Sequence, residues 1–261
     1  MRVLFIGDIV GKVGRKYLNH YLTELKNNQQ FDYVIANGEN AAGGAGMTEK
    51  VFYELRVAGV DVVTSGNHIW DRKDILNFID REPLMLRPAN YPQETTPGKG
   101  SVVLETSAGK PRLAVINLIG RVFMRPVDCP FRAADREISA LKGKADLILV
   151  DFHAEATSEK QALGWYLDGQ VGAVVGTHSH VQTADERLLT NNTAYISDVG
   201  MVGLYDSVLG VDKEGPLKRF LTQMPHKLSI TDGRTLFSAV VIEFDGAKGL
   251  ATSIERIFKI T

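Results

Sequence analysis

Short runs of apolar, mostly β-branched residues recur along the first two thirds of the chain, and few polar residues interrupt them. Runs of this kind are typical of strands that are buried on both faces of a sheet. Six of them predict six strands: RVLFIGD (2–8), YVIANGEN (33–40), DVVTSGNH (61–68), RLAVINLIG (112–120), DLILVDFHAE (146–155) and GAVVGTHSHV (172–181).

The segments between the runs have helical spacing. Apolar residues three or four positions apart form one stripe in 17–25 and another in 51–58, as on a helix that packs one face on a core. Strands that alternate with helices predict an α/β fold with helices packed on the sheet.

The last third has a different pattern. The apolar runs NTAYISDVG (192–200), TLFSAVVIEF (235–244) and ATSIERIFKIT (251–261) are separated by turn signals at 231–233 and 245–246. We expect antiparallel strands here, in a second sheet. Because no long polar linker and no repeat divides the sequence, residues 1–261 are predicted to form a single domain.

Composition narrows the class of protein. Apolar residues make up 44% and charged residues 23%, which is ordinary for a soluble protein. The formal net charge of −1 provides no field for nucleic acid or membranes, so RNA binding is open but unsupported by charge. The single cysteine, Cys129, fits a reducing compartment. With no membrane-spanning stretch and no signal peptide, we predict a cytoplasmic location without membrane contact.

The stretch GDIVGKVG (7–14) lies between a predicted strand and a helix, where a phosphate-binding loop is expected. The P-loop requires four residues between its glycines and Ser or Thr after its Lys. Here three residues separate Gly7 from Gly11, and Val13 follows Lys12. The pattern G-x-G-x-x-G is not met either. The remaining feature is Asp8, for which a turn or helix-capping role is the simpler interpretation.

Polar side chains that bind metals end five of the six runs. In open α/β sheets, sites form beyond the carboxyl ends of the strands. Taken singly, Asn67 is also explained as a left-handed turn residue and His153 as a core histidine. The joint pattern favours one shared site, whose candidate residues are Asp8, Glu39, Asn40, Asn67, His68, His153, His178 and His180.

The donor types indicate the kind of metal. Carboxylate, carboxamide and imidazole without thiolate exclude a cysteine-based zinc site and suit iron, manganese or zinc. Without His68, seven side chains remain. If Glu39 bridges, they supply about eight bonds, whereas two six-coordinate ions need roughly twelve, which leaves room for a bridging hydroxide and substrate oxygens. We therefore expect two metal ions, with iron and manganese as first choices.

The motifs resemble those of the calcineurin-like metallophosphoesterases, whose usual signature is GD-x-H, GD-x-x-D, GNH and GH-x-H. The closer resemblance is to the YmdB-like bacterial phosphodiesterases, through ANGENAAGGAGMT (36–48), SGNHIWD (65–71) and GTHSHVQTAD (176–185). NLIGRVFM (117–124) and YISDVGMVG (195–203) are also similar to that family. The resemblance implies a four-layer αββα sandwich, with two mixed β-sheets flanked by helices.

Two departures from the wider signature affect the ligand set. Val10 stands where a histidine usually follows the first aspartate, and Glu39 replaces the usual bridging aspartate, with Asn40 behind it. By resemblance, one metal is held by Asp8, Glu39, Asn40 and His180, and the other by Glu39, Asn67, His153 and His178. The glycines near Asp8 then let the chain turn so that this carboxylate faces a metal.

The resemblance also implies a phosphodiesterase that hydrolyses nucleoside cyclic phosphates, 2′,3′-cyclic and possibly 3′,5′-cyclic. A hydroxide that bridges the metals attacks phosphorus, and His68 protonates the leaving oxygen. A role for His68 limited to hydrogen bonding with a ligand is the alternative. Two other functions stay open: a phosphomonoesterase or nucleotidase on the same site, and a non-catalytic RNA-interacting regulator.

Substrate contacts are less defined. Arg121 and Arg125 are candidates for phosphate or base contact, with surface ion pairs as the alternative. Trp70 and Phe123 are candidates for stacking on a base, with core packing as the simpler interpretation. The resemblance further implies a homo-oligomer.

Overall fold

Seven strands form the first sheet in the computed structural model, which describes residues 1–104 and 110–261. Their order is β2-β11-β14-β1-β3-β4, and β15 pairs with β14. The sheet is mixed, because β1 is parallel to β3 and antiparallel to β14. Its strands are β1 (Arg2–Ile6), β2 (Asp8–Ile9), β3 (Tyr33–Asn37), β4 (Val62–Thr64), β11 (Met201–Leu204), β14 (Thr235–Asp245) and β15 (Leu250–Ile260).

The second sheet is also mixed and has the order β5-β6-β7-β8-β10-β9. Its inner strands β6, β7, β8 and β10 are parallel, and its edge strands β5 and β9 are antiparallel to their neighbours. The strands are β5 (Ser101–Val103), β6 (Leu113–Ile119), β7 (Leu147–His153), β8 (Ala173–Thr177), β9 (Arg187–Leu188) and β10 (Ala194–Ile196).

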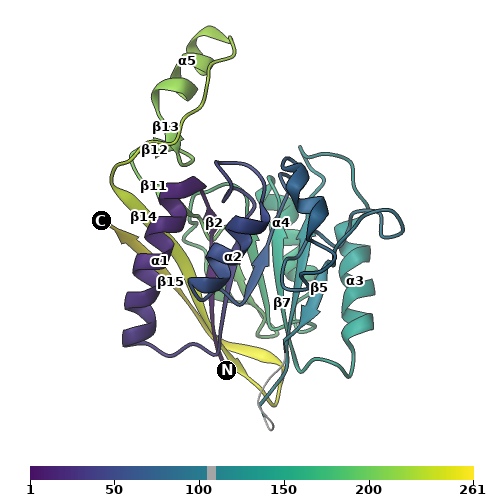
Figure 1. The fold of residues 1–261 in the computed structure, drawn as a ribbon. Coiled ribbons are helices and arrows are strands. Elements are labelled where there is room, and N and C mark those ends of the chain that lie inside the picture. The colour runs from purple at the N-terminus through teal and green to yellow at the C-terminus, as the bar shows by residue number, and fades with distance from the viewer. Residues whose placement is uncertain (105–109) are drawn as a thin grey trace.

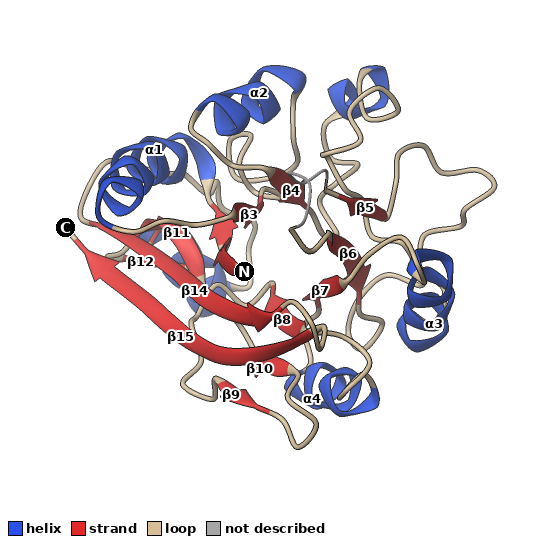
Figure 2. Ribbon diagram, turned by 90° about the horizontal axis from the view of Figure 1, so that it is seen from below, coloured by secondary structure: helices blue, strands red, loops and turns tan. Residues whose placement is uncertain are grey.

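The two sheets pack against each other through apolar side chains, and helices cover the outer face of each sheet. One buried cluster lies between the sheets and includes Phe5, Ile35 and Leu149. On the outer faces, α1 (Gly11–Asn28) and α2 (Glu49–Val57) pack on the first sheet, and α3 (Pro130–Leu141) and α4 (Thr157–Tyr166) on the second. Figure 2 shows these four layers. The predicted αββα sandwich is confirmed.

All six predicted runs form strands. Of the three C-terminal runs, the one at 192–200 forms β10 and lies in the second sheet, where it is parallel to β8 and antiparallel to β9. The expected place of the other two, β14 and β15, is wrong. β14 pairs with β1 along Arg2–Ile6, and it therefore lies inside the first sheet. The second sheet is instead built around β6, β7 and β8. Leu236–Ile242 are buried throughout, and Ser238 is the only polar residue among them, so β14 has the nearly continuous apolar pattern of an inner strand.

Local signals explain the helices. The apolar stripe of 17–25 is buried in α1, and the side chain of Thr48 accepts a hydrogen bond from the Val51 N–H and caps α2. The sequence pattern did not predict α5 (Glu214–Thr222) or the hairpin of β12 (Ser207–Val208) and β13 (Val211–Asp212). These elements project from the body of the molecule (Figure 1). Among the described residues, no helix has the length and apolar character needed to cross a membrane.

Candidate metal centre

The folded chain brings the predicted ligand residues together at one edge of the sandwich. Glu39 follows β3, Asn67 follows β4, His153 ends β7 and His178 follows β8, while Asp8 begins β2. Asp8, Glu39 and His153 are almost entirely buried. The convergence arises because parallel strands of both sheets present their carboxyl ends on the same side.

Asp8, Glu39 and His180 form one group whose candidate ligand atoms all lie within 4.8 Å of one another. Asp8 Oδ1 is 3.8 Å from His180 Nε2. Asn40 joins this group, since its Oδ1 is 3.1 Å from the same nitrogen. The other ring nitrogen of His180 is 3.0 Å from the carbonyl oxygen of Leu209, which fixes the direction of the ring.

Glu39, His153 and His178 form a second group within the same 4.8 Å limit. His153 Nε2 lies 3.2 Å from Glu39 Oε1 and 3.0 Å from His178 Nδ1. Asn67 Oδ1 is 3.0 Å from the same His153 nitrogen. Glu39 is therefore shared by both groups, as a bridging carboxylate is in a dinuclear site.

The backbone is specialised where it passes these side chains. A Cβ atom on Gly66 would lie 2.2 Å from His153 Cδ2 and 2.4 Å from Glu39 Oε2, so only glycine leaves room for the cluster. His178 and His180 both have positive φ, 108° and 63°. Such conformations are uncommon for residues with a side chain and are concentrated at functional sites.

The buried charges perturb one another strongly. Burial raises the pKa of the Asp8 carboxyl to about 7. Burial alone would lower the pKa of His153, but the charge of Glu39 and the hydrogen bond to it raise this pKa to about 9. Burial and the charge of His153 lower the pKa of His178 to about 3. In the absence of a metal ion, a proton on His153 thus neutralises part of the negative charge of the buried carboxylates, as a bound cation would.

The donor set fits a pair of cations. Asp8 Oδ1 is fully buried and has no hydrogen-bond partner among the described residues, although buried polar atoms are almost always paired. Asp8 lies in β2 and does not cap α1, whose N-cap residue is Val10. Asn67 lies in a turn but does not have positive φ. The capping interpretation of Asp8 and the left-handed conformation of Asn67 are therefore wrong.

His68 lies beside the cluster, but its ring is in neither group. Its backbone N–H donates to Glu39 Oε2 over 3.1 Å, and its Nδ1 is 2.7 Å from Asp71 Oδ2. The side chain is 36% exposed. Asp71 holds one ring nitrogen, which leaves Nε2 available to a bound molecule.

The sequence interpretation gave no role to several acidic residues around the cluster. Asp71, three residues after His68, had a visible signal in its spacing. Glu155 Oε2 is 2.9 Å from His178 Nε2. Asp198 accepts hydrogen bonds from the Ser179 N–H and from buried Lys160 Nζ. Asp198 lies 19 positions after Ser179, so its contact with the segment between His178 and His180 is visible only in the fold.

The candidate substrate contacts separate into two kinds. Trp70 is partly buried and packs against the core and Tyr91, as the simpler interpretation predicted. Phe123 is 89% exposed, so core packing is wrong for it. Arg121 and Arg125 are exposed and, within 1–104 and 110–261, take part in no ion pair that would support the surface-pair alternative.

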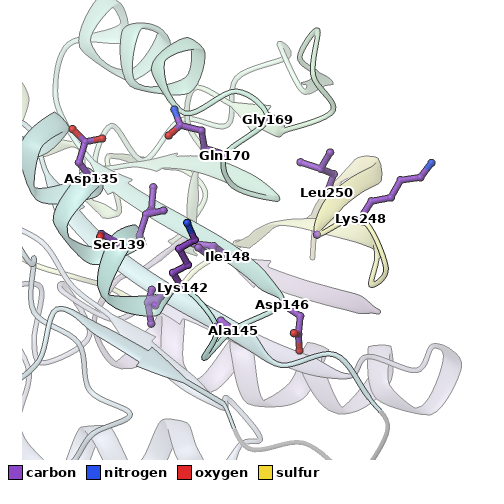
Figure 3. A pocket seen from close by; sticks show the side chains of 14 residues that line it. Asp135, Ser139, Lys142, Ala145, Asp146, Ile148, Gly169, Gln170, Lys248 and Leu250 are labelled. Carbon is purple, nitrogen blue, oxygen red and sulfur yellow. The ribbon is translucent and has the colours of Figure 1, made fainter.

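A separate hollow of about 520 Å³ lies at the opposite end of the second sheet (Figure 3). The figure shows the charged side chains of Asp135, Lys142, Asp146 and Lys248 spread around it. All four residues are exposed, and Asp146 pairs with Arg112. The hollow therefore lacks the buried, facing charges of the metal centre.

The chain is similar to known proteins over nearly its whole length. A model of the YmdB-like protein family matches residues 4–257. The chain is 52% identical over 257 residues to the 2′,3′-cyclic-nucleotide 2′-phosphodiesterase of Bacillus subtilis (strain 168), covering 98% of this chain and 96% of that protein. It is similar to the crystal structure of a hypothetical protein from Thermus thermophilus, with TM-score 0.92, 44% identity and coverage of 100% and 99%.

A more distant similarity concerns the fold alone. The 5′-nucleotidase from Candida albicans matches with TM-score 0.58 and 12% identity, and the match covers 98% of this chain and 50% of the nucleotidase chain.

Proposed function

The chain belongs to the YmdB-like protein family, and on that premise we propose that it is a metal-dependent phosphodiesterase acting on nucleoside cyclic phosphates. A substrate of the 2′,3′-cyclic type is supported by the name of the Bacillus subtilis relative. The observation that carries the proposal is the pair of ligand groups that share the buried carboxylate of Glu39.

Two metal ions fit the residues of these groups. Asp8, Glu39, Asn40 and His180 would hold one ion, and Glu39, Asn67, His153 and His178 the other. Bound cations of this kind neutralise phosphate charge and make hydroxide available at neutral pH. The mixture of imidazole and oxygen donors favours iron or manganese as first choices.

The residues around the cluster would donate a proton and orient the ligands. His68 would protonate the departing ribose oxygen through Nε2, because Asp71 occupies Nδ1 and stabilises the protonated ring. Asn40 is oriented by its own amide group, whose Nδ2 donates to the Gly44 carbonyl over 3.1 Å. Gly43, Gly44 and Gly46 all have positive φ, which lets the loop behind Asn40 fold back on it.

The deciding experiment compares hydrolysis of 2′,3′-cyclic AMP with that of 5′-AMP by protein loaded with Mn²⁺ or Fe²⁺, beside a chelated control. We expect metal-dependent cleavage of the cyclic diester and little action on 5′-AMP. Preference for 5′-AMP would replace the proposal with a nucleotidase. Inertness toward both, together with RNA binding that survives chelation, would favour the regulatory alternative. Cleavage of 3′,5′-cyclic AMP in the same assay tests the wider substrate range.

The cytoplasmic location and the homo-oligomer stay predictions. Cell fractionation tests the first, and sedimentation of the purified protein tests the second.

A further inference from the structure

The loop that follows β6 places an aromatic ring in solvent. Residues 120–125 form this loop, which we call the rim loop. Phe123 is 89% exposed and has φ of 61°. A left-handed conformation is unfavourable for a residue with a bulky side chain, and exposure of a phenyl ring adds no burial to offset it. The fold thus maintains an arrangement that packing alone does not explain.

Buried groups fix the rim loop next to the metal centre. The Gly120 N–H donates to the carbonyl oxygen of His153 over 3.0 Å. The backbone N–H groups of Arg121 and Val122 donate to the carboxylate of Glu159 at 3.0 to 3.2 Å, and Glu159 is only 8% exposed. Phe123 is therefore held three residues beyond a backbone bond to a candidate metal ligand.

The charges near the rim loop suit an anion. Arg121 and Arg125 flank Phe123, and neither forms an ion pair in the described part of the chain. The pKa of Tyr91 is raised, mainly by burial; the Arg125 guanidinium opposes this rise and the Glu39 carboxylate adds to it. The ring of Tyr91 lies 5.7 Å from that of Trp70, two residues after His68.

We propose that the rim loop is the nucleoside-binding lip of the metal centre, where Phe123 stacks on the base of a nucleoside cyclic phosphate. This inference rests on the proposed function. An exposed ring held by a rigid backbone stacks on a base at little entropic cost, and it accepts every base because each has a π face. The lip therefore predicts that a base strengthens substrate binding but that the enzyme discriminates weakly among bases.

The test compares two diesters that differ only in the base. One is 2′,3′-cyclic AMP, and the other is methyl riboside 2′,3′-cyclic phosphate, whose hydrolysis is followed by phosphorus NMR. In the Phe123→Ala variant, we expect KM for 2′,3′-cyclic AMP to rise about 10-fold with little change in kcat, because stacking on one aromatic ring is lost. Kinetics with the base-free diester should not change.

Two further variants separate stacking from a structural effect. Phe123→Trp should keep KM close to the wild-type value, since the indole also stacks. Phe258→Ala removes another exposed ring, which is 54% exposed on β15. It should change the kinetics with neither diester. An unchanged KM for 2′,3′-cyclic AMP in Phe123→Ala would overturn the lip and leave the proposed function intact.

Binding without turnover distinguishes the two hypotheses. Calorimetry of 2′,3′-cyclic AMP with metal-loaded His68→Ala protein, with and without Phe123→Ala, measures the same contact. Inertness of the wild-type protein toward both diesters would overturn the proposed function. A weaker affinity in the double variant would still support the lip, and equal affinities would overturn it.

Discussion

The two ends of β7 lie about 20 Å apart, and each adjoins a group of charged side chains. At the carboxyl end, Asp8, Glu39 and His153 are buried and face one another, and one carboxylate oxygen has no hydrogen-bond partner among the described residues. At the amino end, exposed charges surround the hollow of Figure 3, and Asp146 is paired with Arg112.

The difference shows what identifies a site in this fold. A hollow lined by hydrated charges costs little to form, because each charge stays in water or has a neighbour. Buried carboxylates cost much more unless a cation neutralises them. The buried carboxylates at the carboxyl end therefore favour the binding of a cation, and the exposed charges around the hollow do not.

The largest expected effect follows from removing the shared carboxylate. Glu39→Gln keeps the shape of the side chain but removes the charge common to both ligand groups. We expect the loss of both metal ions and a fall in kcat/KM of roughly 10⁴-fold or more. Metal analysis and steady-state kinetics measure these effects. Glu49→Gln, which changes a more exposed glutamate at the start of α2, is the matched control and should retain metal and activity.

His68→Ala separates chemistry from metal binding at the same end. Because the His68 ring is in neither ligand group, the metal content should not change, while kcat falls by about 10² to 10⁴-fold through loss of the proton donor. Asp71→Asn should have a smaller effect in the same direction, since His68 is retained. Full activity of His68→Ala at unchanged metal content would contradict the assignment.

The sequence predicted which residues gather at the carboxyl ends of the strands better than it predicted the arrangement of the sheets. Each apolar run marks where a strand ends, so the residues that follow it could be collected as one set without knowing the sheets. Membership of a sheet depends on which strands pair. No local sequence signal shows that β14 pairs with β1. The paired residues, such as Arg2 and Glu243, are more than 230 positions apart in the chain.

Exposure was the other property that the sequence did not reveal. Phenylalanine is a residue type usually found in protein cores, so the sequence favoured burial of Phe123. Its left-handed backbone depends on the anchoring of the rim loop by Glu159, 36 positions further along the chain. Asp198 is similar, because its hydrogen bond to the Ser179 N–H is defined only after β8 and β10 have paired. The ligand roles themselves stay predictions until metal is measured.

A smaller effect concerns pH. In the metal-free protein the pKa values of Asp8 and His153 are raised to about 7 and about 9, from 3.8 and 6.5. A group whose pKa is raised by folding stabilises the fold fully below its unfolded pKa and loses that contribution as the pH rises through its folded pKa. The contribution of Asp8 to the free energy of unfolding is therefore lost between about pH 4 and 7, and that of His153 between about pH 6.5 and 9.

Cations replace these protons when they bind. We expect the increase in Tm produced by Mn²⁺ to grow between about pH 6 and pH 8, because the metal-free protein loses stability there and the loaded protein does not. Thermal unfolding with and without Mn²⁺ at each pH measures the difference. An increase that is independent of pH would mean that Asp8 and His153 do not exchange protons for metal.

The smallest effect is expected at the amino end of β7. Lys142 lines the hollow of Figure 3 and is exposed, so Lys142→Ala removes a hydrated charge without creating a cavity or an unpaired buried group. Such surface substitutions change the free energy of unfolding by about 0.5 kcal/mol or less. We expect kcat/KM and metal content to match the wild-type protein. A fall in either would show that the amino end contributes to the site, and the contrast between the two ends would then no longer identify the metal centre.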